Sequence, residues 1–292
     1  MSTSEATDAP ETAVRAALAA HDSTRVLADA VFEPVRGGLS NHAWKAEKDG
    51  RHWFVRLGGP ESATLGADRE SERSLLAVVG AAGLAPKLVA CDPSNGLLVT
   101  QFIEGAPWRR EDARAARNLE RIAQRLRVLH RLAPTTAIRR VDFAAQARSL
   151  EDQRCVPAPA IQRIADAAFE MLASRRTRLA LCHNDLHHLN LLDDGRRLWI
   201  VDWEYGGVGD PLFDLASFAC QHELAADERN ALLAAYGAGD EIPASALDAA
   251  CTAFDYVQWL WYSNWAARHP HAGREYALRA AALEARLAAS GS

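Results

Sequence analysis

The chain has 292 residues, of which 49% are hydrophobic and 24% charged, and it carries a net charge of -5. This composition is typical of a soluble globular protein and argues against a fibrous or largely disordered chain. The negative charge disfavours a nucleic-acid backbone or an anionic membrane surface as partner, so we expect neither. The length suits either one large domain or two lobes around a cleft that binds a small molecule.

The cysteines and the N-terminal stretch indicate the compartment. The five cysteines, Cys91, Cys155, Cys182, Cys220 and Cys251, are odd in number and include no CxxC pair. Such usage favours free thiols in a reducing compartment. The first residues lack a basic stretch followed by an apolar core, and no run of 18 apolar residues occurs. We therefore predict a cytoplasmic protein that is neither exported nor membrane-spanning.

The first hundred residues predict a β-rich region. A polar start of about ten residues and a short Ala-rich helix precede the runs "VFEPVRGG", "NHAWKAEKDG" and "RHWFVRLGG", which Gly and Asp-Gly turns separate. The stretch "ADRESERSLLAVVGAAG" has helical periodicity that ends at Gly83. Two further strands follow in "APKLVACDPSNGLLVTQFIEG", joined by a Pro-Ser-Asn-Gly turn. Residues 30–104 should form a five-stranded antiparallel sheet with one inserted helix.

The rest of the chain predicts helices. Residues 112–132 have apolar side chains on one face of a long amphipathic helix. Further helices are expected at residues 160–174, 225–236, 244–268 and 272–289. The prediction is an α+β protein with a β-rich lobe at residues 1–104 and a helical lobe at residues 105–292.

The segment "LALCHNDLHHLNLLDDGRRLWIVDWEYGG" concentrates polar residues between two strand-like pieces. Asp185 lies five residues before Asn190, and Asp202 follows the apolar run "LWIV". An aspartate on a loop can accept a proton from a hydroxyl group. An asparagine oxygen and a second carboxylate can hold Mg²⁺ between nucleotide phosphates. The alternative is a simple turn rich in Asn and Asp, which the flanking strands disfavour. The segment indicates phosphoryl transfer.

With these residues the chain resembles the choline kinase and aminoglycoside phosphotransferase family, nearest to the bacterial choline/ethanolamine and thiamine kinases. "HNDLHHLN" fills the pattern H-x-D-x-x-x-x-N, and "GGLSNHAWKAE", "FVRL", "DRESE", "GLAPKL", "QFIEG" and "VDWEYGGVGDPLFDLA" occur in family order. The resemblance implies a bilobal protein-kinase-like fold. The small lobe would hold an antiparallel sheet with one helix, and the larger lobe would be mainly helical.

The resemblance also implies roles in catalysis. Asp185 would be the catalytic base that orients and deprotonates the acceptor hydroxyl. Asn190 and Asp202 would act in catalysis by binding Mg²⁺. His183 would brace the loop, and Asp214 would tie it to the helical lobe.

A second implied set of residues would bind ATP. An arginine on the third strand would grip phosphate through two N–H donors, and a helix glutamate would pair with it, with Glu70 as the alternative to the expected Glu72. The loop "GGLSN" between the first two strands would cover the phosphates. Backbone groups at the connection between the lobes would bind adenine. The residues in this set are Gly38, Leu39, Ser40, Asn41, Arg56, Glu72, Thr100, Gln101 and Phe102.

The stretch "DYVQWLWYSNWAARH" suggests where the acceptor would bind. At helical spacing Tyr256 groups with Trp259 on one face, while Trp261 or Tyr262 groups with Trp265 on another, and one of these faces would be core. Judged without the family, all of these residues would be core. With the family, Trp261 and Trp265 would line a pocket for a cation, because aromatic faces attract quaternary ammonium groups. Glu204, in "DWEY", would join the substrate or metal site.

The sequence therefore predicts an ATP- and Mg²⁺-dependent kinase that phosphorylates a small cationic alcohol, with choline first. Asp210, Glu223 and Asp255 could add negative charge around that cation. Thiamine is the next candidate acceptor, because the thiamine kinases share "DWEY" and also need an aromatic pocket for a cation, and aminoglycosides come third. Gln221 stands where eukaryotic choline kinases place an acidic residue, which leaves the exact acceptor open. A pseudokinase that binds nucleotide without turnover is the alternative of a different class.

Other polar residues of the segment are expected to matter least. His183, His187 and His188 lack matching cysteine or histidine partners for zinc. His187 and His188 are predicted to be loop residues near the phosphates or simply solvated. Asp193 and Asp194 are predicted to have no role in the reaction.

Overall fold

The computed structural model describes residues 5–35, 41–58, 68–151, 155–237, 242–269 and 273–290. They belong to two compact units, which we describe separately. The first comprises residues 1–108, 134–139 and 189–207, and the second comprises residues 109–133, 140–188 and 208–292. The predicted lobe boundary, between residues 104 and 105, lies close to the end of the first segment. The two later segments of the first unit were not part of that prediction.

The first unit contains a five-stranded antiparallel sheet. In spatial order its strands are β1 (Val31–Pro34), β2 (Asn41–Lys48), β3 (Arg51–Gly58), β5 (Leu97–Gln101) and β4 (Leu88–Asp92). Asp49 and Gly50 join β2 to β3 with φ angles of 52° and 70°. Asp-Gly favours this tight hairpin turn because glycine adopts positive φ without strain. The predicted sheet is confirmed.

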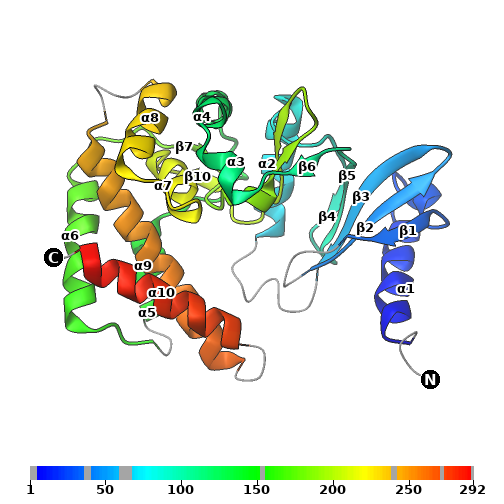
Figure 1. Cartoon of the computed structure of the whole chain (residues 1–292). Coiled ribbons are helices and arrows are strands. Elements are labelled where there is room, and N and C mark those ends of the chain that lie inside the picture. The colour runs from blue at the N-terminus through cyan, green and yellow to red at the C-terminus, as the bar shows by residue number, and fades with distance from the viewer. Residues whose placement is uncertain are drawn as a thin grey trace. The chain divides into compact units, whose positions relative to one another are not determined.

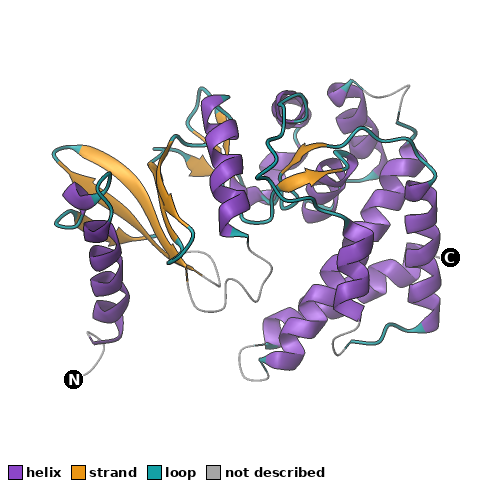
Figure 2. Ribbon diagram, turned by 180° about the vertical axis from the view of Figure 1, so that it is seen from behind, coloured by secondary structure: helices purple, strands orange, loops and turns teal. Residues whose placement is uncertain are grey.

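Two helical segments cover one face of this sheet: α1 (Glu5–Ala20) and the 3-10 helix η1 (Arg25–Leu27) (Figure 1). Val14 and Leu18 of α1 are fully buried against Trp44, Val55 and Val99 of the sheet. Figure 2 shows α1 beside the strands. The helix begins at Glu5, earlier than predicted, because polar residues in a first turn carry no hydrophobic pattern.

Helix α2 (Arg69–Ala81) follows in the first unit. The Asp68 side chain caps it by accepting the Ser71 N–H at 3.0 Å, and Leu75 and Val79 are fully buried. In the turn between β4 and β5, Gly96 has a φ of 72°, and a Cβ there would lie 2.9 Å from the Gly58 Cα. Only glycine meets both conditions.

A three-stranded sheet completes the first unit. Its strands are β6 (Ala106–Pro107), β8 (Leu191–Asp193) and β9 (Leu198–Ile200), in that order, and the 3-10 helix η2 (His188–Asn190) precedes β8. Leu191 pairs with Ile200, and the Val201 N–H donates to the Asn190 carbonyl at 3.0 Å. The β8–β9 hairpin thus places Asn190 and Asp202 at the same end.

The second unit is mainly helical, with one small sheet of β7 (Ala180–Cys182) and β10 (Gly207–Gly209). Its helices are α3 (Arg110–Arg114), α4 (Ala116–Leu129), α5 (Phe143–Glu151), α6 (Pro159–Ala173), α7 (Leu212–Gln221), α8 (Ala226–Tyr236), α9 (Ala244–Arg268) and α10 (Arg274–Ser290). The long helix α9 is the centre of this unit, and α5, α6, α7 and α10 pack against it (Figure 1). Phe254, Tyr256 and Leu260 of α9 are buried in the resulting core.

The predicted helices differ from the structure in three places. The single helix predicted over residues 112–132 is wrong: Ala115, with a ψ of 132°, separates α3 from α4. The Asn118 side-chain amide donates a hydrogen bond to the Asp112 carbonyl at 2.8 Å. Helices α5 and α7 were not predicted. Residues 212–220 of α7 are all buried, so their sequence has no one-sided pattern.

The helices predicted at residues 160–174, 225–236, 244–268 and 272–289 are confirmed within two residues at each end. In the described part of the chain, no helix is long and apolar enough to cross a membrane. All five cysteines are free.

Candidate active site

In the second unit a buried carboxylate anchors the loop that follows β7. Asp214, on α7, is fully buried. Its oxygens accept the backbone N–H groups of His183 at 3.0 Å and Asn184 at 2.7 Å. His130 Nε2 lies 3.0 Å from the same carboxylate, and His130 Nδ1 lies 2.7 Å from the Tyr236 hydroxyl. This geometry matches the tie between loop and helices that the resemblance implies for Asp214.

The next two residues of the loop are fixed as well. The Asp185 N–H donates to His183 Nδ1 at 3.2 Å, and the Leu186 N–H donates to Ser217 Oγ at 2.9 Å. His183 is fully buried, whereas the Asp185 side chain remains 20% exposed. Four successive backbone amides are therefore held by side chains. Because the backbone is fixed, the Asp185 carboxylate is presented in a defined place.

His187 lies beside this carboxylate. Its Nε2 is 3.6 Å from Asp185 Oδ2. Burial lowers the pKa of His187 to about 4, with a smaller contribution from the positive charge of Arg279. The imidazole is therefore neutral at pH 7 and forms no ion pair with Asp185. His187 was predicted to matter least, yet its ring lies beside the predicted base.

His130, Cys182 and Asp214 place three potential metal-ligand atoms within 4.8 Å of one another. Burial raises the pKa of the Cys182 thiol well above its ordinary value, and the charge of Asp214 raises it further. A metal would need the thiolate. The Asp214 oxygens already accept backbone N–H groups. Asp214 therefore braces the loop by hydrogen bonds, and His130 contacts its carboxylate.

The first unit holds a buried network of opposite charges. Arg56 on β3 is 4% exposed, and its Nη2 lies 2.7 Å from the Oε2 of Glu72 on α2, which is 1% exposed. Arg69 Nη1 lies 2.7 Å from the same oxygen. Glu70 instead pairs with Arg73 at the surface, so the glutamate that pairs with Arg56 is Glu72.

The charges in this network shift the acid–base equilibria of its members. Burial alone would raise the pKa of Glu72, but the attraction of Arg56, helped by Arg69, lowers it below its ordinary value. Burial alone would lower the pKa of Arg56, but Glu72 raises it. Both groups are charged at neutral pH, and each is the reason that the other remains charged.

Asp202 and Glu204 extend the network differently. Asp202 Oδ1 lies 3.6 Å from Arg56 Nη1, and its side chain is 42% exposed. Glu204 Oε2 lies 3.0 Å from Arg69 Nη1, and its side chain is 8% exposed. The resemblance suggested that Glu204 contacts substrate. In the structure its carboxylate contacts Arg69, a residue of "DRESE" that the sequence analysis did not single out.

Asn190 and Asp202 fit a divalent cation. They lie at the same end of the β8–β9 hairpin and offer amide and carboxylate oxygens, which Mg²⁺ prefers. Asp202 has a φ of 64° and is the exposed carboxylate of the network. Two guanidinium groups, of Arg56 and Arg69, face the three carboxylates of Glu72, Asp202 and Glu204. Of these three carboxylates Asp202 is the most exposed, at 42%, and is therefore the one that a cation reaches most easily.

Arg139 is a further residue that the sequence did not reveal. Its Nε donates to the Gly206 carbonyl at 3.1 Å, and its Nη2 donates to the Glu204 carbonyl at 3.2 Å. Its backbone N–H donates to Ser71 Oγ at 2.9 Å. Arg139 thereby holds the backbone after Asp202. Its segment, residues 134–139, lies between predicted helices and carries no motif.

The residues predicted to bind ATP are placed only in part. Some of the phosphate-covering loop lies outside the described residues, namely Gly38, Leu39 and Ser40, and the Asn41 side chain is also undescribed. The Gln101 N–H donates to the Lys87 carbonyl at 2.9 Å, and the Phe102 N–H donates to the His52 carbonyl at 3.3 Å. Thr100 pairs with both neighbouring strands. The amides of Gln101 and Phe102 are therefore engaged within the protein.

The aromatic residues of α9 divide into two groups. Tyr256 and Trp259 stack with centroids 5.8 Å apart and are buried, as the core interpretation predicted. Trp261 and Trp265 stack in parallel, with centroids 5.7 Å apart and 3° between their planes. Tyr276 of α10 lies 6.1 Å and 5.9 Å from these two rings. Tyr276 comes from another helix, so sequence spacing gave no signal for it.

The acidic residues that could have faced a cationic substrate are paired with arginines inside the second unit. The pairs, each within 4.0 Å, are Asp210 with Arg175, Glu223 with Arg110, and Asp255 with Arg286. Burial raises the pKa of Asp255, although Arg286 opposes the rise. These carboxylates are largely neutralised, which does not support the suggested role.

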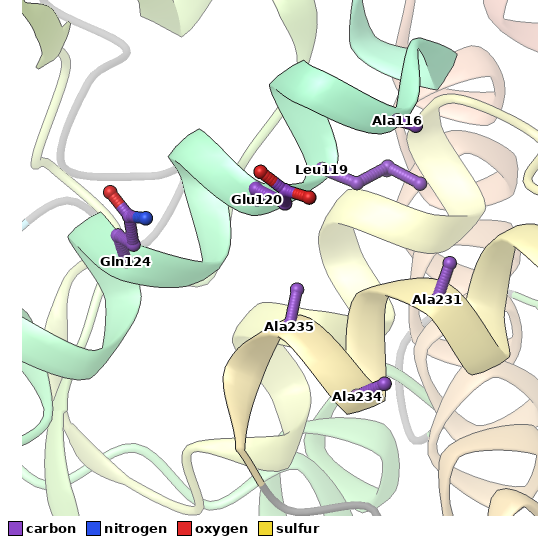
Figure 3. A pocket seen from close by; sticks show the side chains of 7 residues that line it. All are labelled: Ala116, Leu119, Glu120, Gln124, Ala231, Ala234 and Ala235. Carbon is purple, nitrogen blue, oxygen red and sulfur yellow. The ribbon is translucent and has the colours of Figure 1, made fainter.

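A surface groove of about 400 Å³ runs between α4 and α8 (Figure 3). Its lining is formed by alanines together with Leu119, Glu120 and Gln124. None of the predicted catalytic or binding residues lines it. The groove is therefore not the candidate active site.

The fold, a loop aspartate on braced backbone and a buried arginine–glutamate pair beside an exposed aspartate define a protein-kinase-like phosphotransferase. Residues 31–254 match the family described as the phosphotransferase enzyme family. The chain belongs to this family. The predicted resemblance and fold are confirmed.

Solved structures support the same assignment. A choline/ethanolamine kinase family protein from Mesorhizobium loti superimposes with a TM-score of 0.76 at 26% identity, covering 96% of this chain and 94% of that one. The choline kinase LicA from Streptococcus pneumoniae has a TM-score of 0.72 at 20% identity, covering 88% and 94%. A spectinomycin phosphotransferase in complex with ADP and spectinomycin has a TM-score of 0.63 at 13% identity, covering 89% and 92%. The last two show the fold alone.

A shorter match concerns protein LicA from Haemophilus influenzae. It is 44% identical over 55 residues, which are 19% of this chain and 21% of that protein. The chain thus matches about a fifth of the length of this curated relative.

Proposed function

We propose that the chain transfers the γ-phosphate of ATP to the hydroxyl group of a small cationic alcohol, with choline as the first candidate. The observation that carries the proposal is the loop in which four successive amides are fixed while the Asp185 carboxylate stays accessible. A base must be held in place to act in phosphoryl transfer, where catalysis is mainly positioning and charge neutralisation. The likeness to the Mesorhizobium loti protein supports the choice of acceptor class.

In the proposed reaction Asp185 accepts the hydroxyl proton as the acceptor oxygen forms its bond to the γ-phosphorus. The bond from that phosphorus to the bridging oxygen breaks, and ADP leaves. Arg56 holds phosphate oxygens, and Glu72 keeps its guanidinium in place. Asn190 and Asp202 would hold Mg²⁺, which neutralises phosphate charge when bound.

Some roles differ from those that the resemblance implied. Glu204 and Arg69 position the network, because their charged groups contact each other at 3.0 Å and are buried. The amide of Ile103, the next after two engaged amides, is the donor that we propose for adenine. The side chains of Trp261 and Trp265 are proposed to contact the cation of the acceptor.

The test is a coupled assay of ADP release over choline, ethanolamine, thiamine and aminoglycosides. We expect turnover with a cationic alcohol and a loss of about 10²–10⁴-fold in Asp185→Ala, because a general base contributes on that order. Thermal unfolding of the variant should match the wild type. Tight nucleotide binding without transfer to any acceptor would favour the pseudokinase alternative instead.

A further inference from the structure

The guanidinium group of Arg279 lies over two tyrosine rings in the second unit. Its Cζ is 5.7 Å from the ring centroid of Tyr262 on α9 and 5.7 Å from that of Tyr276 on α10. The two rings are 5.8 Å apart, with 34° between their planes. Arg279 Nη1 also donates to the Tyr262 hydroxyl at 3.4 Å. We call the two ring faces the cation seat.

The cation seat lies beside Trp261, which was predicted to line the acceptor pocket. Trp261 lies 5.2 Å from Tyr262 and 6.1 Å from Tyr276, measured between ring centroids. Aromatic faces attract any cation through their quadrupole, and a guanidinium group satisfies that attraction as an ammonium group does. In this structure the chain's own cation fills the seat.

Electrostatic effects connect the cation seat with the base. Burial raises the pKa of Tyr262, the bond from Arg279 opposes this, and the charge of Asp185 raises it further. Burial lowers the pKa of His187, and the charge of Arg279 lowers it further. His187 in turn lies 3.6 Å from Asp185. Arg279 and the predicted base Asp185 therefore both shift the pKa of Tyr262.

Arg279 is held weakly. Its side chain is 51% exposed, and its ion pair with Glu275, at 2.7 Å, joins it to a side chain that is 67% exposed. Exposed ion pairs and exposed cation–π contacts each contribute little. Glu275 lies one helical turn before Arg279, so the pair can persist when the guanidinium leaves the rings. Together, the contacts of Arg279 with the cation seat favour the guanidinium on the rings over the guanidinium in solvent by about tenfold.

We propose that Arg279 is an internal competitor for the cation seat, so that a cationic acceptor binds only after the guanidinium has left the faces of Tyr262 and Tyr276. This inference rests on the proposed function. A site that is available for only a fraction of the time binds its ligand more weakly by that fraction. The effect raises KM by the same factor for every acceptor whose cation uses the seat, and it leaves acceptors that bind elsewhere unaffected.

The test compares Arg279→Met with the wild type and with Arg274→Met. Methionine keeps the length and helix preference of the side chain and removes the charge. Arg274 is an exposed arginine of the same helix, so its variant controls for the loss of one positive charge. Binding of tetramethylammonium is measured by calorimetry. This probe has no hydroxyl group, so its binding does not depend on turnover.

We expect Arg279→Met to bind tetramethylammonium about tenfold more tightly, and Arg274→Met to stay within about twofold of the wild type. KM for a cationic alcohol should fall by the same factor with kcat unchanged. Replacing Tyr276 by leucine in the Arg279→Met background should remove the gain, because the aromatic face is lost. Circular dichroism checks that each variant is folded.

Unchanged or weaker tetramethylammonium binding in Arg279→Met would overturn the proposal. Loss of transfer to an acceptor with a carboxylate or phosphate group would overturn it too, because Arg279 would then bind that anion. Tighter binding of the probe without phosphorylation of any alcohol would leave the competitor in place and refute the proposed function. A failure of the competitor proposal is therefore distinguishable from a failure of the proposed function.

Discussion

Two aspartates that the motifs place twelve residues apart are built into the molecule in opposite ways. Asp214 is fully buried, and its oxygens accept the backbone N–H groups of His183 and Asn184. Asp202 has a side chain that is 42% exposed and a charged contact with Arg56 at 3.6 Å. A carboxylate whose hydrogen bonds are filled by the protein fixes structure. An accessible carboxylate beside a cation is available to a ligand.

The largest expected effect on stability comes from Asp214→Ala. The substitution removes the acceptor for buried backbone N–H groups and for His130, and buried donors that lose a charged partner are costly. We expect the free energy of unfolding to fall by about 3–5 kcal/mol in urea titrations. A loss below about 1 kcal/mol would show that water replaces the carboxylate and that the brace is dispensable.

Asp202→Asn tests the exposed aspartate of the comparison. Phosphate transfer should fall by about 10²–10³-fold, as expected when an electrostatic group at the reacting phosphates is lost. The free energy of unfolding should change by less than about 0.5 kcal/mol, because the side chain is exposed. Glu70→Gln removes one negative charge from an exposed position of the same unit and should leave transfer unchanged. Equal losses in both variants would contradict the assignment.

The pair of Arg56 and Glu72 is buried, as Asp214 is, and its contribution to the free energy of unfolding should depend on pH. The folded-state pKa of Glu72 lies below its ordinary value of 4.5, because Arg56 overcomes the effect of burial. The stabilisation by its charge is therefore complete above pH 4.5 and is lost as the pH falls through the folded-state pKa. Glu72→Gln should be less stable than the wild type at pH 7, and this difference should narrow toward pH 3. Urea titrations at several pH values measure it, and a difference independent of pH would refute the charged pair.

The smallest effect is expected on the buried face of α9. Tyr256 donates its hydroxyl to Glu151 at 2.7 Å, so Tyr256→Phe should cost about 1 kcal/mol of stability without altering KM. Trp261→Leu, on the other face, should raise KM for a cationic acceptor. If Tyr256→Phe altered KM as strongly as Trp261→Leu, the division of α9 into core and acceptor faces would be wrong.

Much of the fold could be predicted because its elements have a regular pattern. The hairpins carry turn residues, α6 has helical periodicity, and α8, α9 and α10 are long stretches rich in the helix-forming residue alanine. Helix α7 was missed because it is buried on all sides, and the break at Ala115 was missed because alanine favours helix. Neither feature leaves a local signal.

The sequence by itself determined the family and the spacing of Asp185, Asn190 and Asp202, because the residues of a catalytic loop are close together in the chain. Only the tertiary structure decided which groups contact one another. It selected Glu72 over Glu70 for Arg56, and it brought Arg69 to Glu204 and Arg279 to Tyr262. These partners come from different elements, and the packing of those elements, which no local pattern encodes, sets the distances between them.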